Sequence, residues 1–492
     1  MVQNAIKLLE NLGALLPSDM NLSTSDMPQY LEFLKRSDEI QKMNSVVKSG
    51  ELSEIGRLMS LFPIHPRFAK ILVSALFSLH SSIGSSKSRD QLQSQVRLVS
   101  FTLTLIAAIA ERSVFNLDRI KSARSEEDSE EEQEEDAEAI ASTQKLEQAL
   151  KEDSYKLFCH ESGDSLALLR AVGAYIYKVS ECAQHKLKQK SDAVNLTKST
   201  IKTISNQYSE ELQTFCSHFN LQEVTLKRIL DLRHQLQVIV ESMLPKISFF
   251  KDLSSENFQS FKFPSPQSPP SDKEELLIRQ LLLSGYSDQI AKKLPVGLLR
   301  TGNKRKRFTA YITCNPMFYT KEMLLNQSQD RFSSKKVDNN TNNSMVPLYI
   351  HPSSNLFPNN PLQHLPEYVM YHNIIMNQSK TTYYMTNVTV IDEKWIINIA
   401  KDSPLLSYGD ILTSPQPFYD ATMDEIFCYV TPKYGNPAMS QLWELSTVKK
   451  PMIEVLKKKF PSFQIEILTK KIEGGDGVQV PLGYRKQDEI YR

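Results

Sequence analysis

Apolar residues recur at helical spacing along the first part of the chain. Residues 5–12 place alanine and leucine on one face, and Gly13 directly after them is a helix stop signal. Two further helical patterns lie between residues 51 and 115. Pro63 and Pro66 separate them, because proline cannot continue a helix through its own position. The N-terminal part of the chain is therefore predicted to be helical.

Helical patterns resume from residue 164 to about residue 244. The clearest is TLKRILDLRHQLQVIVESM, which has an apolar stripe made of Leu226, Ile229, Leu230, Leu236 and Val240. Arg233 falls inside this stripe. Its simpler interpretation is an ion pair with a neighbouring helix, and its functional interpretation is a guanidinium that reaches a phosphate or an adjacent domain.

The apolar period changes from 3.6 to 2 after residue 300. The segments RFTAYITC, VPLYIHP, KTTYYMTNVTVID and EKWIINIA are rich in β-branched and aromatic residues and partly alternate. Before them, residues 274–294 predict a helix that Gly285 and Tyr286 interrupt. Several short strands after a helix are typical of a small OB-type barrel. The predicted fold is a multidomain α plus β protein.

Charge is segregated along the chain although the net charge of its 492 residues is only +1. Ten carboxylates lie between Glu126 and Glu138, and like charges at this density cannot bury a core. We expect a disordered acidic insertion at about 122–142. A solvated spacer is the simpler interpretation, and a site for a basic partner is the alternative.

Five cysteines are present, and no two have the CxxC spacing. This odd number argues against a disulfide framework and a cysteine zinc site and fits a reducing compartment. The most apolar run, residues 98–110, is too short to span a bilayer and predicts a buried helix. No membrane partner is expected.

Catalytic motifs are missing from the sequence. It has no GxxxxGK[ST] phosphate loop, no G-x-S-x-G elbow and no HExxH. A hydrolase interpretation is suggested by His351, Ser353 and Ser354, but no carboxylate stands in a triad-like context. In addition, side chains of neighbouring residues at one strand end do not reliably point toward each other, as a nucleophile and its base must. We therefore predict no catalytic residue and no metal site.

One basic run, Lys304 to Arg307, directly precedes a predicted strand, and tyrosines such as Tyr371 and Tyr384 follow in the same region. Cations beside aromatic faces on a small barrel are how single-stranded nucleic acid is gripped, with charges on phosphates and rings on bases. A solvated loop beside an ordinary barrel core is an equally acceptable interpretation of these residues alone.

Five ordered segments resemble the C-terminal half of DEAH-box RNA helicases. They are ELSEIGRLMSLFPIHPRFAKIL (51–72), GDSLALLRAVGAY (163–175), TFCSHFNLQEVTLKRILDLRHQL (214–236), LIRQLLLSGYSDQIAKK (277–293) and the stretch from VPLYIHPSSNLF to IDEKWI (346–396). The ordered series is more specific than any one segment. The form of the helical region and of residues 366–388 is most similar to the family member of the small-subunit processome, which acts in ribosome biogenesis.

The resemblance implies a domain order. A partial winged-helix domain would occupy 1–60, and a mostly helical ratchet domain 61–250. A proline- and serine-rich linker at 251–273 would lead to an OB-fold domain at 274–404 and a C-terminal extension at 405–492. The phosphate loop and the DEAH acids are not in this sequence. The resemblance thus implies ATP and Mg²⁺ for an intact member, while this chain alone should not hydrolyse ATP.

The same resemblance implies partners and roles for particular residues. RNA, specifically single-stranded or structured pre-rRNA, is the expected partner, with a G-patch activator protein as a second one and the nucleolus of the nucleus as the location. Arg67 and Arg233 are candidates for the ratchet and its interdomain contacts. Candidate RNA-binding residues are Lys304, Arg305, Lys306, Arg307, His351, Ser353, Ser354, Tyr371 and Lys380. The alternative is a stand-alone RNA- or protein-binding module that has lost the motor.

Overall fold

The computed structural model describes residues 2–15, 52–84, 89–111, 113–115, 156–187, 207–247, 262–294, 309–315, 346–357, 364–376, 382–401, 403–420, 422–423, 425–435, 443–459, 471–473 and 479–481. The chain forms two compact units. The larger comprises Leu58–Ile312 and Pro347–Ile391, and the smaller comprises Met1–Arg57, Thr313–Val346 and Asp392–Arg492. Each is described by itself.

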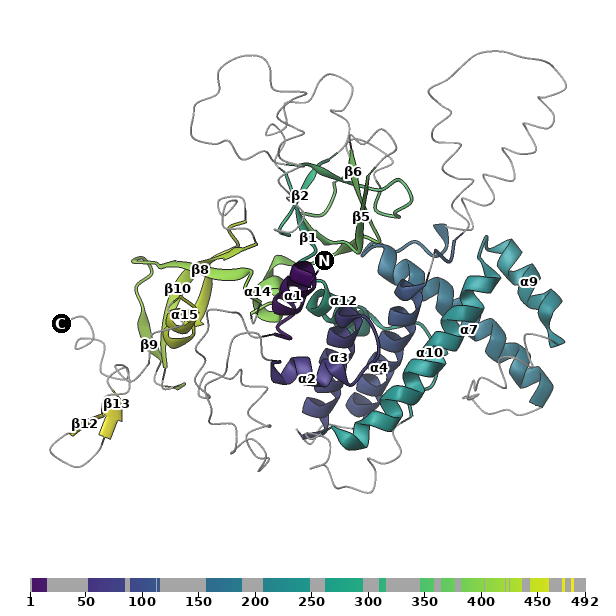
Figure 1. Ribbon diagram of the computed structural model, residues 1–492, viewed down its shortest axis with the longest axis horizontal. Coiled ribbons are helices and arrows are strands. Elements are labelled where there is room, and N and C mark those ends of the chain that lie inside the picture. Colours follow the sequence, from purple (N-terminus) through teal and green to yellow (C-terminus); the bar gives the residue numbers. More distant parts are fainter. Residues whose placement is uncertain are drawn as a thin grey trace, which may run out of the picture. The chain divides into compact units, whose positions relative to one another are not determined.

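The larger unit begins with long helices that pack side by side (Figure 1). They are α3 (Pro66–Gly84), α4 (Arg89–Ala110), α7 (Asp164–Leu187), α9 (Ser209–His218), α10 (Glu223–Met243) and α12 (Asp272–Gly285). Helix α4 is central, since α3, α7, α10 and α12 all pack on it. The hydroxyls of Thr102 and Thr104 are buried in this helix and donate to the carbonyls four residues earlier at 2.8 and 2.9 Å, so they add no unpaired polar group to the core.

Helix α4 passes a length and composition test for a membrane span, over Asp90–Ala110. However, 67% of the most apolar 18-residue segment of this helix is buried inside the protein. This is how the core helix of a helical domain behaves, and it confirms the prediction of a buried helix for residues 98–110. The stripe predicted for residues 225–243 is also confirmed. Helix α10 buries Leu226, Ile229, Leu230, Leu236 and Val240, with Arg233 among them.

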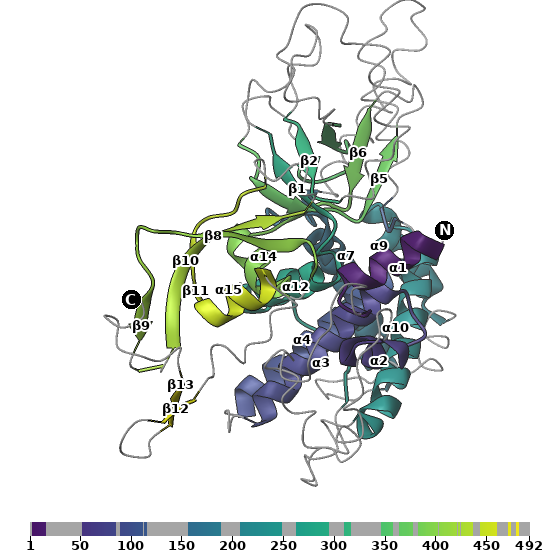
Figure 2. The same cartoon turned by 60° about the vertical axis from the view of Figure 1, so that its left-hand side comes forward.

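A seven-stranded sheet follows the helices in the larger unit (Figure 2). Its strands are β1 (Ile290–Lys293), β2 (Tyr311–Thr313), β3 (Leu348–Ile350), β4 (Tyr368–Met370), β5 (Asn373–Met376), β6 (Tyr383–Thr386) and β7 (Thr389–Val390). Their spatial order is β5-β6-β3-β2-β1-β4-β7. Strands β3 and β6 pair in parallel, whereas β1 with β4, β2 with β3, β4 with β7 and β5 with β6 pair antiparallel. A helical part followed by β structure is thus confirmed.

Residues 262–271 connect the helices to α12 without regular structure of their own. This stretch lies in the predicted 251–273 linker, whose last two residues, 272 and 273, already belong to helix α12. It is attached to the helices, because Phe263 is fully buried and Gln267 Nε2 donates to Ser180 Oγ at 3.0 Å. We call residues 262–271 the strap.

The smaller unit contains α1 (Val2–Asn11), most of α2 (Glu54–Ser60), α14 (Glu393–Ile399) and a second sheet. The predicted helix stop is confirmed at Gly13, whose φ of 69° favours glycine. The sheet has the order β11 (Val448–Pro451), β10 (Glu425–Tyr434), β8 (Leu406–Ile411), with β9 (Phe418–Asp420) also on β10. Helix α15 (Met452–Lys459) packs on this sheet, and β12 (Lys471–Glu473) pairs with β13 (Gln479–Pro481) as a separate hairpin.

Two predicted elements are wrong. EKWIINIA was assigned to a strand but forms α14, because Asp392 caps its first turn by accepting from the Lys394 N–H at 2.9 Å. The buried residues Ile396, Ile397 and Ala400 then follow helical spacing. The interruption predicted at Gly285 and Tyr286 is confirmed, because helix α12 ends at Gly285, but the helix expected beyond it is wrong, since residues 290–293 form β1. The predicted acidic insertion lies outside the described residues.

Candidate nucleic-acid interface

The β3–β6–β5 part of the seven-stranded sheet carries a row of large side chains. Tyr349 pairs with Tyr384 across the parallel ladder, and Tyr384 pairs with Ile375 across the antiparallel one. Paired residues share a face, so these three form one row. The opposite face holds Leu348, Ile350 and Met385, which are buried. The row is the half-exposed face, with Ile375 42% exposed.

Aromatic rings touch along this row. The Tyr349 and Tyr384 ring centroids are 6.4 Å apart and tilted by 53°. The His351 ring lies edge-on to Tyr384, at 5.7 Å and 90°. We call Tyr349, His351 and Tyr384 the aromatic row. Half-exposed rings at these distances present π faces and edges on which nucleic-acid bases can stack.

A tight turn after β3 fixes the His351 ring. The Ser353 N–H donates to His351 Nδ1 at 3.1 Å, and the Ser353 hydroxyl lies 2.6 Å from the same nitrogen. Because Nδ1 accepts from a backbone N–H, the proton of a neutral ring sits on Nε2. The Ser354 N–H closes the turn on the His351 carbonyl at 2.9 Å. Ser353 is thus brought next to the His351 ring of the aromatic row.

The next residues of the turn face inward and join the sheet to helix α7. The Asn355 N–H donates to Asp164 Oδ1 and the Val388 N–H to Asp164 Oδ2, both at 2.8 Å. The Ser354 hydroxyl also bonds the Asp164 carboxylate. Burial raises the pKa of Asp164 to about 6 although these three hydrogen bonds lower it. Ser354 is buried and therefore holds the fold together here instead of facing RNA.

Backbone contacts surround this carboxylate. The Asp164 N–H donates to the Val388 carbonyl at 2.8 Å, and the Val390 N–H donates to the Ser162 carbonyl at 2.9 Å. A Cβ on Gly163, whose φ is 112°, would lie 2.3 Å from the Val388 oxygen. Only glycine permits this approach. We call this contact of residues 160–165 with 354–356 and 388–390 the Asp164 junction.

A histidine extends the Asp164 junction. His160 Nε2 lies 2.9 Å from Glu275 Oε2, and the His160 carbonyl accepts from Asn355 Nδ2 at 2.9 Å. Burial lowers the pKa of His160, partly opposed by Glu275. Since the Ser162 N–H donates to Nδ1 at 3.0 Å, the neutral ring keeps its proton on Nε2, facing the carboxylate.

Arg67 on α3 makes a second contact between the helices and the sheet. Its guanidinium pairs with Asp288 through two nitrogens, with Nη2–Oδ2 at 2.9 Å, and Nη1 donates to the Gly285 carbonyl at 3.0 Å. It also lies 5.5 Å from the Tyr286 ring centroid. Both ionic side chains are almost fully buried. We call this the Arg67 junction.

Tyr371 and His372 belong to the interior beside the Arg67 junction. Tyr371 is 1% exposed, so its ring cannot stack on a base as proposed from the sequence, and its N–H donates to the Gln289 carbonyl at 3.1 Å. His372 Nδ1 lies 2.5 Å from the Tyr286 hydroxyl, and its ring stacks on Phe68. Burial lowers the pKa of His372 to about 4, and Arg67 and His65 add to this.

Arg233 is buried without a direct carboxylate partner among the described residues. Its three nitrogens donate to Thr104 Oγ1, Gln237 Oε1 and the Phe263 carbonyl, each at 2.9 Å. Burial lowers the pKa of Arg233 to about 10, partly opposed by Glu241. The ion pair expected with a neighbouring helix is not observed. Arg233 instead attaches the strap to α4 and α10.

The sequence analysis found some of these residues and missed others. Lys304–Arg307 and Lys380 lie outside the described residues. Tyr349 could have been found, since it alternates with Leu348 and Ile350 in a period-2 pattern. Asp164 and Asn355 could not be paired from the sequence, because 191 residues separate them.

Comparison with known proteins fits this geometry. Residues 278–403 match the family model "Oligonucleotide/oligosaccharide-binding (OB)-fold". This range contains all seven strands of the sheet and the aromatic row. The chain thus contains an OB-fold domain of the class found in nucleic-acid-binding proteins.

Relatives extend the likeness beyond this domain. "Probable ATP-dependent RNA helicase kurz" of Drosophila melanogaster is 22% identical over 421 residues, which are 85% of this chain and 26% of the fly protein. The human "Probable ATP-dependent RNA helicase DHX37" is 24% identical over 86% of this chain and 26% of its own length. The Saccharomyces cerevisiae "Probable ATP-dependent RNA helicase DHR1" is 23% identical over 94% and 31%.

The chain therefore matches the C-terminal region of DEAH-box RNA helicases. It spans between a quarter and a third of the length of these relatives.

Proposed function

We propose that this chain supplies the RNA-binding auxiliary modules of a DEAH-box RNA helicase that acts in small ribosomal subunit biogenesis in the nucleolus. The aromatic row in the OB-fold domain carries the proposal. Tyr349 and Tyr384 from two paired strands, with His351 directly after the first strand, line one half-exposed face, while the opposite face is buried. Stacking on such a face is tolerant of sequence, as a helicase that moves along RNA requires.

In this proposal the aromatic row stacks on bases and the cations bind phosphates. Lys304–Arg307 and Lys380 are assigned to the phosphates, and Ser353 with the His351 Nε2–H to polar edges of the RNA. Residues 1–60 and 61–250 would correspond to the winged-helix and ratchet domains. ATP, Mg²⁺ and hydrolysis belong to motor segments that this sequence does not contain, and an activator of the G-patch class would dock on these modules.

Binding of labelled single-stranded RNA by the full chain tests the proposal, with fluorescence anisotropy as the measurement. Tyr384→Ala should weaken binding about tenfold, because loss of one base–aromatic stack costs about 1–3 kcal/mol. Tyr177→Ala is the matched control, since Tyr177 on α7 is 59% exposed and lies outside the aromatic row. It should bind as the unchanged chain does.

Changing Lys304 to Arg307 to alanine separates the two contributions. This variant should flatten the slope of log affinity against log salt, because fewer counterions are released, whereas Tyr384→Ala should leave the slope unchanged. Wild-type affinity in Tyr384→Ala would overturn the assignment of the aromatic row. No binding of any single strand by the unchanged chain would favour the protein-binding alternative.

A further inference from the structure

Two Ser-Pro dipeptides lie three residues apart in the strap, at Ser265–Pro266 and Ser268–Pro269. Serine followed by proline is the minimal motif of proline-directed protein kinases, which bind their substrates in an extended form. The strap has neither helix nor strand between residues 262 and 271. Both serines therefore satisfy the sequence requirement, and only their surroundings distinguish them.

Ser265 is held inside the protein. It is 8% exposed, and the preceding Phe263 is fully buried. The Phe263 N–H donates to Glu241 Oε1 at 3.1 Å, and the Phe263 carbonyl accepts from Arg233 Nη2 at 2.9 Å. Presenting Ser265 to an enzyme would require removal of this aromatic side chain from the core and loss of both hydrogen bonds.

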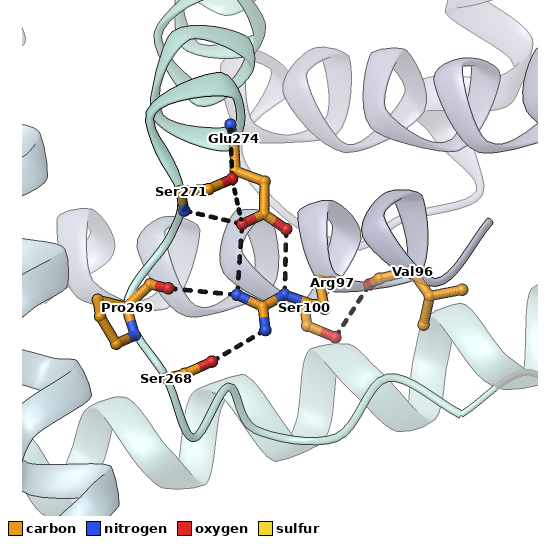
Figure 3. Close-up of polar contacts among 7 residues, drawn as sticks. All are labelled: Val96, Arg97, Ser100, Ser268, Pro269, Ser271 and Glu274. Atoms are coloured by element: carbon orange, nitrogen blue, oxygen red, sulfur yellow. Dashed lines mark hydrogen bonds and ion pairs between the residues drawn. The ribbon is translucent and has the colours of Figure 1, made fainter. Parts of the chain in front are cut away.

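Ser268 is exposed, and within the described part of the chain its side chain is held by Arg97 of helix α4 (Figure 3). Arg97 Nη1 donates to Ser268 Oγ at 2.9 Å, and Nη2 donates to the Pro269 carbonyl at 3.2 Å. Lifting this part of the strap breaks these hydrogen bonds and the one between Gln267 and Ser180. No fully buried apolar side chain has to move with it.

We propose that Ser268 is a phosphorylation site for a proline-directed protein kinase and that Arg97 binds the phosphate. In the reaction the Ser268 oxygen attacks the γ-phosphorus of ATP. The bond from that phosphorus to the bridging oxygen of ADP breaks, and the hydroxyl proton passes to the catalytic carboxylate of the kinase. The products are phosphoserine and ADP.

The geometry around Arg97 suits a phosphate. Its Nε and Nη2 face Glu274, at 3.0 Å to Oε1 and 3.3 Å to Oε2, whereas Nη1 faces Ser268 (Figure 3). Glu274 keeps further partners in the Ser271 N–H and hydroxyl of the capping box, at 2.9 and 3.0 Å. A phosphate on Ser268 can therefore accept charge-assisted hydrogen bonds from Nη1 while Glu274 stays attached to helix α12.

The first experiment treats the folded full chain with a cyclin-dependent or mitogen-activated class kinase and ATP and maps the products by mass spectrometry. Ser268 should be modified at least tenfold faster than Ser265. A free peptide of residues 258–275 should lose most of this preference, because it has no fold to protect Ser265. Ser268→Ala should remove the label from this segment. Equal rates at both serines in the folded chain, or no reaction at Ser268 when the peptide reacts, would overturn the proposal.

The second experiment follows the phosphate by ³¹P NMR during a pH titration. The second pKa of the Ser268 phosphate should be higher in Arg97→Gln than in the unchanged chain, because a nearby cation favours the dianion. Arg97→Lys keeps the charge and should restore most of the lower value. The difference should shrink as salt is raised. Identical titrations with and without Arg97, in variants that melt as the unchanged chain does, would show that Arg97 does not bind the phosphate.

Discussion

The Asp164 junction and the Arg67 junction join the same helical region to the same OB-fold sheet by opposite electrostatic means. At the Asp164 junction a buried carboxylate accepts two backbone N–H groups and a hydroxyl, all of them neutral. At the Arg67 junction a buried guanidinium meets the carboxylate of Asp288. One charge is solvated by dipoles, and the other is neutralised by a partner.

This difference determines how each junction responds to change. Burial raises the pKa of Asp164 to about 6, because the neutral dipoles around the carboxylate lower the pKa by less than burial raises it. A paired charge, when it is deleted, leaves its partner buried and uncompensated. The Arg67 junction should therefore be the more sensitive to mutation, and the Asp164 junction should gain stability as pH falls from about 6 to 4.

The largest effect is expected from Asp288→Ala, which leaves the Arg67 guanidinium buried and without its carboxylate. The free energy of unfolding should fall by about 3–5 kcal/mol, measured by urea denaturation. The double variant Arg67→Met with Asp288→Leu removes both charges and should recover most of this loss. A loss below 1 kcal/mol in the single variant would show that the pair is solvated.

Gly163→Ala should cost about 3 kcal/mol, because the new Cβ meets the Val388 carbonyl at 2.3 Å and the φ of 112° excludes other residues. Gly173→Ala, inside helix α7, which begins directly after Gly163, is the control. No atom lies within 4 Å of its added Cβ, so it should stabilise the protein by about 0.5–1 kcal/mol. Thermal melting of both variants measures the contrast, and equal melting temperatures would contradict it.

Acid should act on the Asp164 junction with a defined sign. The folded-state pKa of about 6 lies above the ordinary value of 3.8, so the protonated carboxyl contributes stability that is lost as pH rises from about 4 to 6. Asp164→Ala should therefore cost more at pH 4 than at pH 7, by up to about 3 kcal/mol. Urea denaturation of both proteins across this range gives the difference, and a cost independent of pH would contradict the raised pKa.

His372 beside the Arg67 junction should show the opposite slope. Its pKa is lowered from 6.5 to about 4, so the stability that it contributes is present above pH 6.5 and lost as pH falls through 4. His372→Gln should cost more at pH 7 than at pH 4, by about 2 kcal/mol, since partial exposure moderates the effect. The same denaturation series tests this, and a slope of the same sign as that of Asp164→Ala would contradict it.

The sequence predicted the helices and strands with a regular apolar period better than it predicted the contacts between distant segments. The stripe on α10 and the alternation around Tyr349 follow from periods of 3.6 and 2, which local sequence records. Helix α14 was missed because its β-branched residues favour a strand, whereas the Asp392 cap and burial at helical spacing favour a helix. Tyr371 was assigned to RNA on residue type alone, and burial that depends on distant segments placed it inside.

The junction residues show why the rest could not be predicted. Asp164 lies in a helical motif and Ser354 in a strand-end motif, and each motif has a complete local explanation without the other. Their contact depends on how the helices pack on the sheet within the larger unit, which no period or spacing in the sequence encodes. Residue types with several roles, such as Arg233, are equally ambiguous until their neighbours are known.

Because 224 residues separate Asp164 from Val388, the Asp164 junction can form only some time after Asp164 has been synthesised. A ribosome that adds about 5–20 residues per second needs on the order of 10–45 s to make this interval. Helix α7 can form early, but during that time its Asp164 carboxylate faces water and titrates as an ordinary acid. The start of helix α7 in the nascent chain therefore stays exposed to water until residues 354–390 have been made. A chaperone that recognises this exposed surface could bind it only during that interval.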